Sequence, residues 1–580
     1  MTIDDKRDPK VLEEPTTVSS SIPIAALSKP ASSSNRHRGS DATDTVGSGV
    51  GEEDEDSNIT LHDAEPASTA TVVEKDVEKG RAPGNATKSE QEEHYYSVED
   101  GSEIIVVKWK GPDDPANPLN WSNPRRMTST FIVAAFTLLA PLSSSAISPA
   151  APQVAQALGI TSQVELSMVT SIFVLAFAIG PLLLAPASEL YGRVRVIQCA
   201  NLVYVIFNLV CAFAKTKGQF IAFRFIAGLG GGAPLSIGAG VLADLWRPEE
   251  RGRAAALYSL GPLLGPALGP IAGSWIAQRI PNDGYKWIFY STTIFSALVQ
   301  GLGLILLRET YHPVLLNEQV AQIKKSMNLP RSSDKVQTIF DVKAGGKKKP
   351  MQVFRHGMCR PLVLFFHEPI IQVQSLYMGL LYGIIYMMLV STTAIFEVVY
   401  HESTGIAGLN FIAMGLGFFV AAQGGARLLD VIYRKLKVRY NSPGRPEFRL
   451  PFQFPAAVLL PLGLLLYGWG AERALHWIVT DIGLFLVSFS MILVFQSTQM
   501  YLLDVFGIFS ASAVAATVCL RSLFGFALPL AAPYMWDSLG YGWGCTLLAG
   551  AAILISWPTI PVLWFYGERI RMKSKFARKS

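Results

Sequence analysis

Apolar stretches of about 20 residues recur along the chain from residue 128 onward, and shorter polar connections separate them. A helix needs about 20 apolar residues to cross a bilayer, so each stretch predicts a membrane-spanning helix. We count twelve such stretches, six on each side of a long polar segment. Their approximate ranges are 128–149, 164–186, 195–214, 220–245, 252–278, 286–307, 371–396, 406–427, 452–470, 475–497, 506–533 and 541–565. The pattern therefore predicts an all-α membrane protein with twelve transmembrane helices.

Polar segments divide the chain into five parts. Residues 1–112 are rich in Ser, Thr, Asp, Glu and Lys and poor in large apolar residues, so we expect a disordered tail. Residues 113–307 and 363–566 each contain six predicted spans and are expected to form one six-helix bundle each. Residues 308–362 are predicted to be a central loop, and the basic residues 567–580 a C-terminal tail.

Lysine and arginine are unevenly distributed over the connections between the predicted spans. With the N-terminus in the cytosol, the basic connections, the central loop and the C-terminal tail all lie on the cytosolic side. The opposite side then keeps only Lys215, Lys217, Arg279, Lys286 and Arg473. Cytosolic loops of membrane proteins carry an excess of Lys and Arg, so this orientation is the expected one. An even number of spans also places the C-terminus in the cytosol.

The composition agrees with a membrane protein. Hydrophobic residues make up 50% of the chain and charged residues 16%, whereas soluble domains contain about 25% charged residues. The net charge of +5 gives no support to a nucleic-acid partner. The five cysteines form no CxxC pair, so we expect neither a metal site nor a disulfide framework. The sequence contains no G-x(4)-G-K-[ST] motif, and no His or acidic residues cluster at one face of the predicted membrane region, so we expect no cofactor and no enzyme activity.

The connection between the second and third spans combines an acid, a turn glycine and a base. In PASELYGRVR these are Glu189, Gly192 and Arg193. Anchoring on the cytosolic side would explain the arginine but not the acid. Similar residues follow the eighth span in GGARLLDVIYRKLK, where Asp430 and Arg434 stand in the matching place. This internal repeat indicates a duplicated six-span unit.

Two arginines lie inside predicted spans. Arg224 is in the fourth span, and Arg521 stands about half-way along the eleventh. A charge within the bilayer is costly, so such a residue usually faces a cavity or a partner. We expect Arg521 to face a cavity and to meet an acid, a carbonyl group or a substrate. Arg224 either faces a cavity as well or extends to the outer interface, which lies only a few residues away.

The start of the seventh span carries an unusual number of polar residues. Glu368, Gln372 and Ser375 share one helix face at i, i+4 and i+7, and Tyr382 continues that face. Tyr377 lies in the same span. We predict a polar cavity along this face. Glu368 either titrates in a partly desolvated setting or is a plain carboxylate at the membrane interface.

The fifth span contains glycine and proline once per helical turn, in SLGPLLGPALGPIAGS. The residues are Gly261, Pro262, Gly265, Pro266, Gly269, Pro270 and Gly273. Glycines at this spacing leave a smooth groove that a neighbouring helix can approach closely. Each proline removes one backbone hydrogen bond, and in lipid the helix bends rather than unfolds. The pattern indicates either a helix with a special packing role or merely a kinked one.

These motifs resemble those of the major facilitator superfamily, and within it the fungal twelve-span drug:proton antiporters. The matching residues include P-x-S-E-x-Y-G-R at 186–193, R-x-x-x-G from Arg224, the glycine pattern of the fifth span and E-P-I from Glu368. The resemblance extends over about residues 109–570. Two positions depart from the family pattern, because Val194 replaces a base and Pro270 replaces the last glycine of the antiporter motif.

The resemblance implies a fold of two pseudo-symmetric six-helix bundles that rock about a central cavity. It implies export of small, amphipathic or cationic molecules, such as drugs, toxins or secondary metabolites, in exchange for protons. Glu189, Gly192 and Arg193, with Asp244, are implied to latch the two halves on the cytosolic side, with Asp430 and Arg434 as the counterpart. Residues implied for proton coupling or the substrate cavity are Arg224, Glu368, Gln372, Tyr377, Tyr382 and Arg521.

The same resemblance implies a functional monomer in the plasma membrane, or alternatively in a vacuolar or vesicle membrane. A second function remains open, that of a proton-coupled importer or facilitator of polyamines or another nutrient. The glycines of the fifth span count against this alternative, because the antiporter motif separates exporters from importers.

Overall fold

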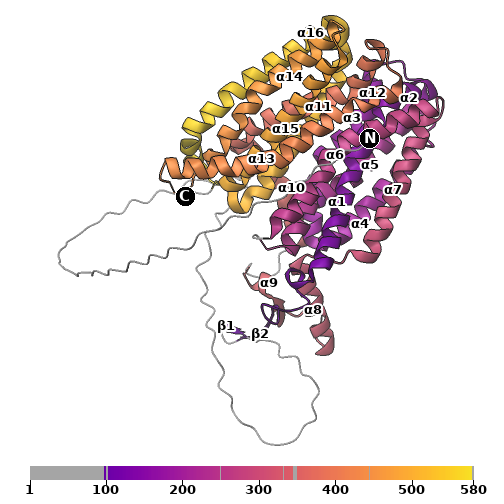
Figure 1. Ribbon diagram of the computed structural model, residues 1–580. Helices are drawn as coiled ribbons and strands as arrows, with labels where there is room; N and C mark the ends of the chain where they lie inside the picture. Colours follow the sequence, from indigo (N-terminus) through magenta and orange to yellow (C-terminus); the bar gives the residue numbers. More distant parts are fainter. Residues whose placement is uncertain are drawn as a thin grey trace, which may run out of the picture. The chain divides into compact units, whose positions relative to one another are not determined.

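The computed structural model describes residues 97–99, 102–247, 250–330, 332–343, 349–442 and 444–577, and helices dominate them (Figure 1). The first half contains η1 (Pro118–Asn120), α1 (Asn123–Ala146), η2 (Ser148–Ala150), α2 (Ala151–Leu158), α3 (Gln163–Tyr191), α4 (Arg193–Cys211), α5 (Lys217–Leu245), α6 (Arg251–Arg279) and α7 (Gly284–Leu306). The second half contains α11 (Pro369–Val398), α12 (Thr404–Leu409), α13 (Phe411–Arg439), η3 (Pro446–Gln453), α14 (Phe454–Glu472), α15 (Trp477–Phe506), η4 (Gly507–Phe509) and α16 (Ser510–Lys573).

Ten stretches of the described residues are long and apolar enough to cross a membrane. The last of them, Trp477–Lys573, contains α15 and the whole of α16. α16 has two arms that meet at Gly540, whose φ of +73° is a left-handed conformation that glycine adopts without strain. Each of the twelve predicted spans falls largely on helical residues, and Gly540 separates the last two. The predicted all-helical membrane fold is therefore confirmed.

Helices pack against one another within each half of the chain, and some of them also contact helices of the other half. In the first half α1 lies against α6, and both α3 and α4 lie against α5. In the second half α11 packs on α16, and α14 contacts α15 and α16. Across the halves, α3 contacts α16, and α6 contacts α12 and α13. In Figure 1, α2 and α12 lie at one end of the long helices and α8 and α9 at the other, so we name these the α12 end and the α8 end.

The segment between the halves is more structured than the predicted central loop. It contains α8 (His312–Ser326), β3 (Val336–Thr338), α9 (Ile339–Lys343) and α10 (Pro350–His367). α10 packs against α3 and α16, so it contacts both halves.

Part of the predicted tail, residues 1–112, contains strands in the structure. β1 (Ser97–Glu99) pairs antiparallel with β2 (Ser102–Val107), and β2 pairs parallel with β3. Val107 and Val336 are buried with Leu316 and Val320 of α8 in a small apolar cluster. The β-branched run Ile104–Val107 favours a strand, and its partner lies more than 200 residues away in the sequence. The disorder predicted for residues 1–96 lies outside the described residues.

Candidate functional site

α6 turns its glycines toward the backbone of α1. The residues involved are Gly261, Gly265, Gly269 and Gly273. A Cβ atom on Gly261 would lie 2.8 Å from the carbonyl oxygen of Ala134, and one on Gly265 would lie 2.8 Å from the Cβ of Pro141. The other two glycines approach α1 more closely still. Real Cβ atoms do not reach such distances from backbone, so any side chain here would force α1 and α6 apart.

The opposite side of α6 contacts the other half of the protein. The backbone N–H of Gly405, in α12, donates a hydrogen bond to Gln278 Oε1 at 2.6 Å. Pro270 is buried, and its carbonyl oxygen accepts a 2.5 Å hydrogen bond from Ser274 Oγ. A Cβ on Gly408 would lie 3.3 Å from that same carbonyl oxygen. The backbones of α6 and α1 are therefore in close contact, whereas the other side of α6 contacts α12 near the α12 end.

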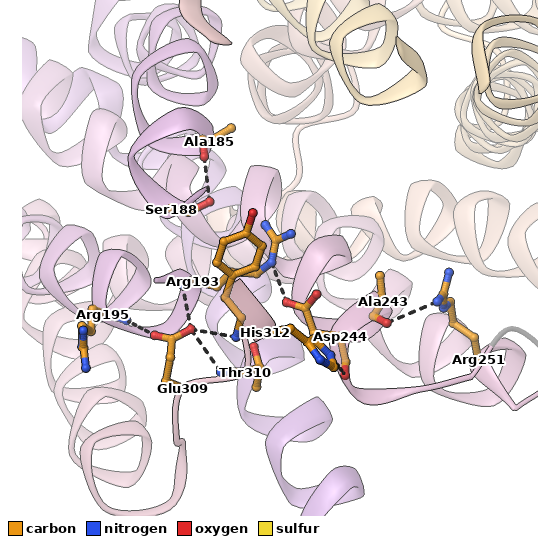
Figure 2. Close-up of polar contacts among 11 residues, drawn as sticks. Ala185, Ser188, Arg193, Arg195, Ala243, Asp244, Arg251, Glu309, Thr310 and His312 are labelled. Atoms are coloured by element: carbon orange, nitrogen blue, oxygen red, sulfur yellow. Dashed lines mark hydrogen bonds and ion pairs between the residues drawn. The ribbon is translucent and has the colours of Figure 1, made fainter. Parts of the chain in front are cut away.

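A charged cluster at the α8 end brings together three elements of the first half (Figure 2). Arg193, the first residue of α4, forms an ion pair with Asp244 near the end of α5, at 2.6 Å between Nε and Oδ2. Glu309, which follows α7, accepts hydrogen bonds from the backbone N–H groups of Arg193, Thr310 and Tyr311 at 2.9–3.0 Å. A carboxylate in this position satisfies free N–H groups at the N-terminus of α4. Among the described residues, no partner of Arg193 lies in the second half.

Gly192 is needed at this turn for both its conformation and its size. Its φ of +102° lies in the region that favours glycine, and a Cβ would collide with the carboxylate of Glu309. Glu189 differs from the prediction, because it is exposed and forms no ion pair among the described residues. The acids that meet Arg193 are Asp244 and Glu309. In the sequence, the only feature that marks Glu309 as a member of this cluster is its position directly after an arginine at the end of the sixth predicted span.

His312 links this cluster to the N-terminal segment of the chain. Its Nε2 lies 3.2 Å from the backbone oxygen of Asp244, and its ring meets Trp109 edge-on, with 5.7 Å between the ring centroids. Burial lowers the pKa of the His312 imidazole, because it disfavours the charged form.

The second half has a corresponding cluster, but its members differ from those predicted. Arg449 forms ion pairs with Asp430 at 3.0 Å and with Asp504 at 3.1 Å, and it lies over the ring of Tyr433. Arg434, the predicted partner of Asp430, reaches only the backbone oxygen of Asp430 at 3.4 Å. Asp504 lies near the C-terminal end of α15, which continues to residue 506.

Arg224 is fully buried within the first half and bonds only to backbone carbonyl groups. Nε donates to the oxygen of Val169 at 3.3 Å, and the two terminal nitrogens donate to Ser143 and Ser144 at 3.2 Å each. The guanidinium also lies 4.7 Å from the ring centroid of Phe173. The five donors of an arginine fork suit such a set of oxygens. Arg224 therefore faces the interior of the bundle and does not extend to the outer interface.

Arg521 has a different environment. It lines a small cavity between α11, α15 and α16, and it is the charged member of that lining. The guanidinium lies over the rings of Tyr382 and Phe495, at 5.0 and 5.3 Å. Among the described residues it forms no ion pair and no hydrogen bond, and its Nε is buried without a partner. Arg521 thus borders a small cavity, and the described residues supply neither an acid nor a carbonyl group as its partner.

Side chains between the two arginines join the halves of the protein. The Oγ of Ser144, whose backbone oxygen accepts from Arg224, lies 3.1 Å from the hydroxyl of Tyr386. The rings of Tyr386 and Tyr382 are 5.1 Å apart, and Arg521 lies over Tyr382. A continuous series of contacts therefore runs from one membrane arginine to the other across the interface.

The other residues predicted for the cavity lie elsewhere. Gln372 Nε2 donates hydrogen bonds to the carbonyl oxygens of Phe365 and Phe366, which lack partners within the helix at the C-terminal end of α10. Glu368 stands at the junction of α10 and α11, and its Oε1 accepts a 2.6 Å hydrogen bond from the hydroxyl of Ser574. Burial raises the pKa of the Glu368 carboxyl. Tyr377 is fully buried in the apolar core.

Phe495 and Gln499, both on α15, line the cavity but were not singled out in the sequence. Their sequence surroundings, FLVSFSMILVFQSTQMY, show no feature that marks these two positions. Only the packing of α15 against α11 and α16 brings them beside Arg521.

Comparison with known proteins places this arrangement in a family. The sequence model described as Major Facilitator Superfamily matches residues 133–529. The chain is 42% identical to the efflux pump vrtL of Penicillium aethiopicum, over 81% of this chain and 91% of that protein. It is 40% identical to an uncharacterized transporter of Schizosaccharomyces pombe, over 81% and 94%.

Solved structures show the same fold at low sequence identity. The xylose transporter XylE from E. coli, in a partially occluded inward open conformation, superimposes with a TM-score of 0.56 at 16% identity, covering 77% of this chain and 98% of that one. A bacterial homologue of the human lysosomal transporter Spinster gives a TM-score of 0.55 at 14% identity, covering 78% and 99%. The chain is therefore a membrane transporter that belongs to the major facilitator superfamily and groups with its fungal members.

Proposed function

We propose that this transporter exports small amphipathic molecules in exchange for protons, by alternating exposure of a central cavity to the two sides of the membrane. The observation that carries this proposal is the packing of α6, whose glycines face the backbone of α1 along the predicted antiporter motif. The name of the fungal relative vrtL, an efflux pump, supports the same direction of transport.

The packing of α6 also supports a mechanism. Because α1 and α6 approach each other at backbone distance, they move as one unit. The opposite side of α6 meets α12 at the α12 end, for example through the hydrogen bond from Gly405 to Gln278. Rocking of the halves then breaks and forms the contacts of α6 with the second half, while its contact with α1 is retained.

We assign the α8 end to the cytosol, and both termini with it. The basic residues that gather there support this orientation, among them Arg193, Arg195 and Arg449. In this orientation the two charged clusters stabilise the cytosolic end of each half and together form the proposed latch region. We further propose a monomer in the plasma membrane, with Arg224 taking part in proton coupling.

Inverted membrane vesicles that contain the full-length protein test this proposal. An inside-acidic gradient is imposed, and uptake of three probes is followed: the cation rhodamine 6G, the anion 1-pyrenebutyrate and its neutral methyl ester. Export in the cell corresponds to uptake by these vesicles, so at least one probe should accumulate and should leave when the gradient is collapsed. Accumulation that ignores the gradient would rule out proton exchange. Uptake only by right-side-out vesicles under an outside-acidic gradient would favour the importer.

A pair of glycine variants tests the role of α6 in this transport. Gly269→Ala places a methyl group against the α1 backbone near Leu142 and should abolish gradient-driven accumulation. Gly301→Ala, on α7, is the matched control because nothing lies within 4 Å of its added Cβ. Equal transport by the two variants would remove the close approach of α1 and α6 from the mechanism.

A further inference from the structure

The cavity beside Arg521 contains hydrogen-bond donors that nothing in the described structure uses. Arg521 has no hydrogen-bonding or ionic partner among the described residues, and its Nε is buried. Gln499 lines the same cavity, is half-buried, and has no hydrogen bond to the described residues. The two side chains come from different helices, α16 and α15, and line the same cavity. The cavity lining contains no carboxylate.

An unpaired guanidinium in this position is costly. Arg521 is half-buried, and it lies about 16 Å along α16 from Ser510, at a rise of about 1.5 Å per residue. A charge at such depth normally finds an acid or a set of carbonyl oxygens, as Arg224 does. The faces of Tyr382 and Phe495 offset part of the cost, because they attract a cation, but they accept no hydrogen bond.

We propose that Arg521 and Gln499 bind the acidic group of the transported molecule, so that the preferred substrates are aromatic amphipathic acids and not cations. Both side chains donate hydrogen bonds, and a carboxylate accepts them in pairs from an arginine. The cavity has room for about one water molecule, so at most an oxygen of the acidic group enters it and the rest of the molecule does not. The aromatic body of the substrate therefore lies outside the cavity. This inference rests on the proposed transport function and replaces the cationic preference expected from the sequence.

Binding to the purified full-length protein tests the inference without a gradient. The protein is placed in nanodiscs of phosphatidylcholine alone, so that no anionic lipid competes for Arg521. The probes are 1-pyrenebutyrate, its methyl ester and a pyrene that carries a trimethylammonium group. Wild-type protein should bind the carboxylate at least about 10-fold more tightly than the ester or the ammonium, because a charge-assisted hydrogen bond is worth that factor or more.

Variants identify the groups responsible. Arg521→Gln should weaken binding of the carboxylate at least about 10-fold and leave the ester unchanged, whereas Gln499→Leu should weaken it by a smaller factor. Arg473→Gln is the matched control, because Arg473 also lies over an aromatic ring, that of Trp469, but is exposed and distant in the fold. Its binding of the carboxylate should equal that of the wild type.

A competition measurement on wild-type protein covers the case in which a variant fails to fold. Here 1-naphthoate should displace 1-pyrenebutyrate, and 1-naphthamide should not. Equal binding of carboxylate and ammonium, equal displacement by naphthoate and naphthamide, or full binding of the carboxylate by folded Arg521→Gln would each overturn the inference. Because binding has no direction, a protein that shows the predicted pattern but no gradient-driven uptake would refute the export proposal and retain this site.

Discussion

The two arginines within the membrane region, Arg224 and Arg521, have opposite environments. Arg224 is fully buried, and three backbone oxygens accept hydrogen bonds from its guanidinium. Arg521 lies beside a cavity and contacts two aromatic rings, but it has no hydrogen-bond acceptor among the described residues. Since an unpaired charge is costly within the membrane region, the difference indicates two roles. Arg224 helps to hold the first half together, whereas Arg521 is available to a ligand.

The largest effect is expected when Arg224 is replaced by methionine, a side chain of similar length. Arg224→Met removes three charge-assisted hydrogen bonds, each worth about 1.5–3 kcal/mol. We expect the free energy of unfolding to fall by about 3 kcal/mol or more, as a lower midpoint in thermal unfolding of the full-length protein. An unchanged midpoint would mean that the carbonyl contacts do not stabilise the first half.

The link between the two arginines should have an intermediate effect. Tyr386→Phe removes the hydroxyl that lies 3.1 Å from Ser144 Oγ across the interface of the halves. We expect a loss of about 1 kcal/mol in thermal unfolding. Tyr566→Phe is the control, because Tyr566 is exposed. If both variants unfold at the wild-type temperature, the link contributes nothing to the contact between the halves.

Replacing Arg521 should change the free energy of unfolding less, and should leave it unchanged or raise it. Arg521→Met removes a half-buried charge that has no acceptor, while it also removes two cation–π contacts worth about 0.5–1 kcal/mol each. These contributions offset each other, so the free energy of unfolding should stay within about 1 kcal/mol of the wild-type value or rise. A loss as large as that of Arg224→Met would show that Arg521 has a stabilising partner, and the comparison would fail.

The smallest effect concerns the aromatic ring of Phe495. Phe495→Leu removes one face from under the Arg521 guanidinium, a contact worth about 0.5–1 kcal/mol, and should change the dissociation constant of 1-pyrenebutyrate by about 2- to 5-fold. Phe485→Leu, on the same helix but stacked on Phe489, should leave that constant unchanged. Equal effects of the two substitutions would show that the ring acts through packing of α15 alone.

The helical spans could be predicted from the sequence because their cause is local. An apolar stretch long enough to cross a bilayer must satisfy its own backbone groups, and a helix does so within the segment. This holds even for α6, with its three prolines, which is a continuous helix from Arg251 to Arg279. β2 is not evident from the sequence, because one of its two partner strands, β3, is distant along the chain and the other, β1, has only three residues.

Side-chain partners were predicted less well than helices. The sequence pattern predicts one helix face through Glu368 and Gln372. In the structure α10 ends at His367, and the Gln372 side chain donates a hydrogen bond to a carbonyl oxygen at that end. The acceptors of Arg224 are backbone oxygens, which residue types do not reveal. Arg521 lines a small cavity, and its depth in the span leaves it few other environments.

Thermal unfolding of Arg224→Gln and Arg521→Gln, each with and without saturating 1-pyrenebutyrate, tests the division of roles most directly. A ligand at about 100 times its dissociation constant stabilises a protein by about 2.7 kcal/mol. We predict that Arg224→Gln unfolds at a lower temperature but is still stabilised by the ligand. Arg521→Gln should unfold like the wild type and gain at most about half of the ligand stabilisation, because its binding is at least about 10-fold weaker. The reverse pattern, with ligand stabilisation retained in Arg521→Gln and lost in Arg224→Gln, would contradict the account.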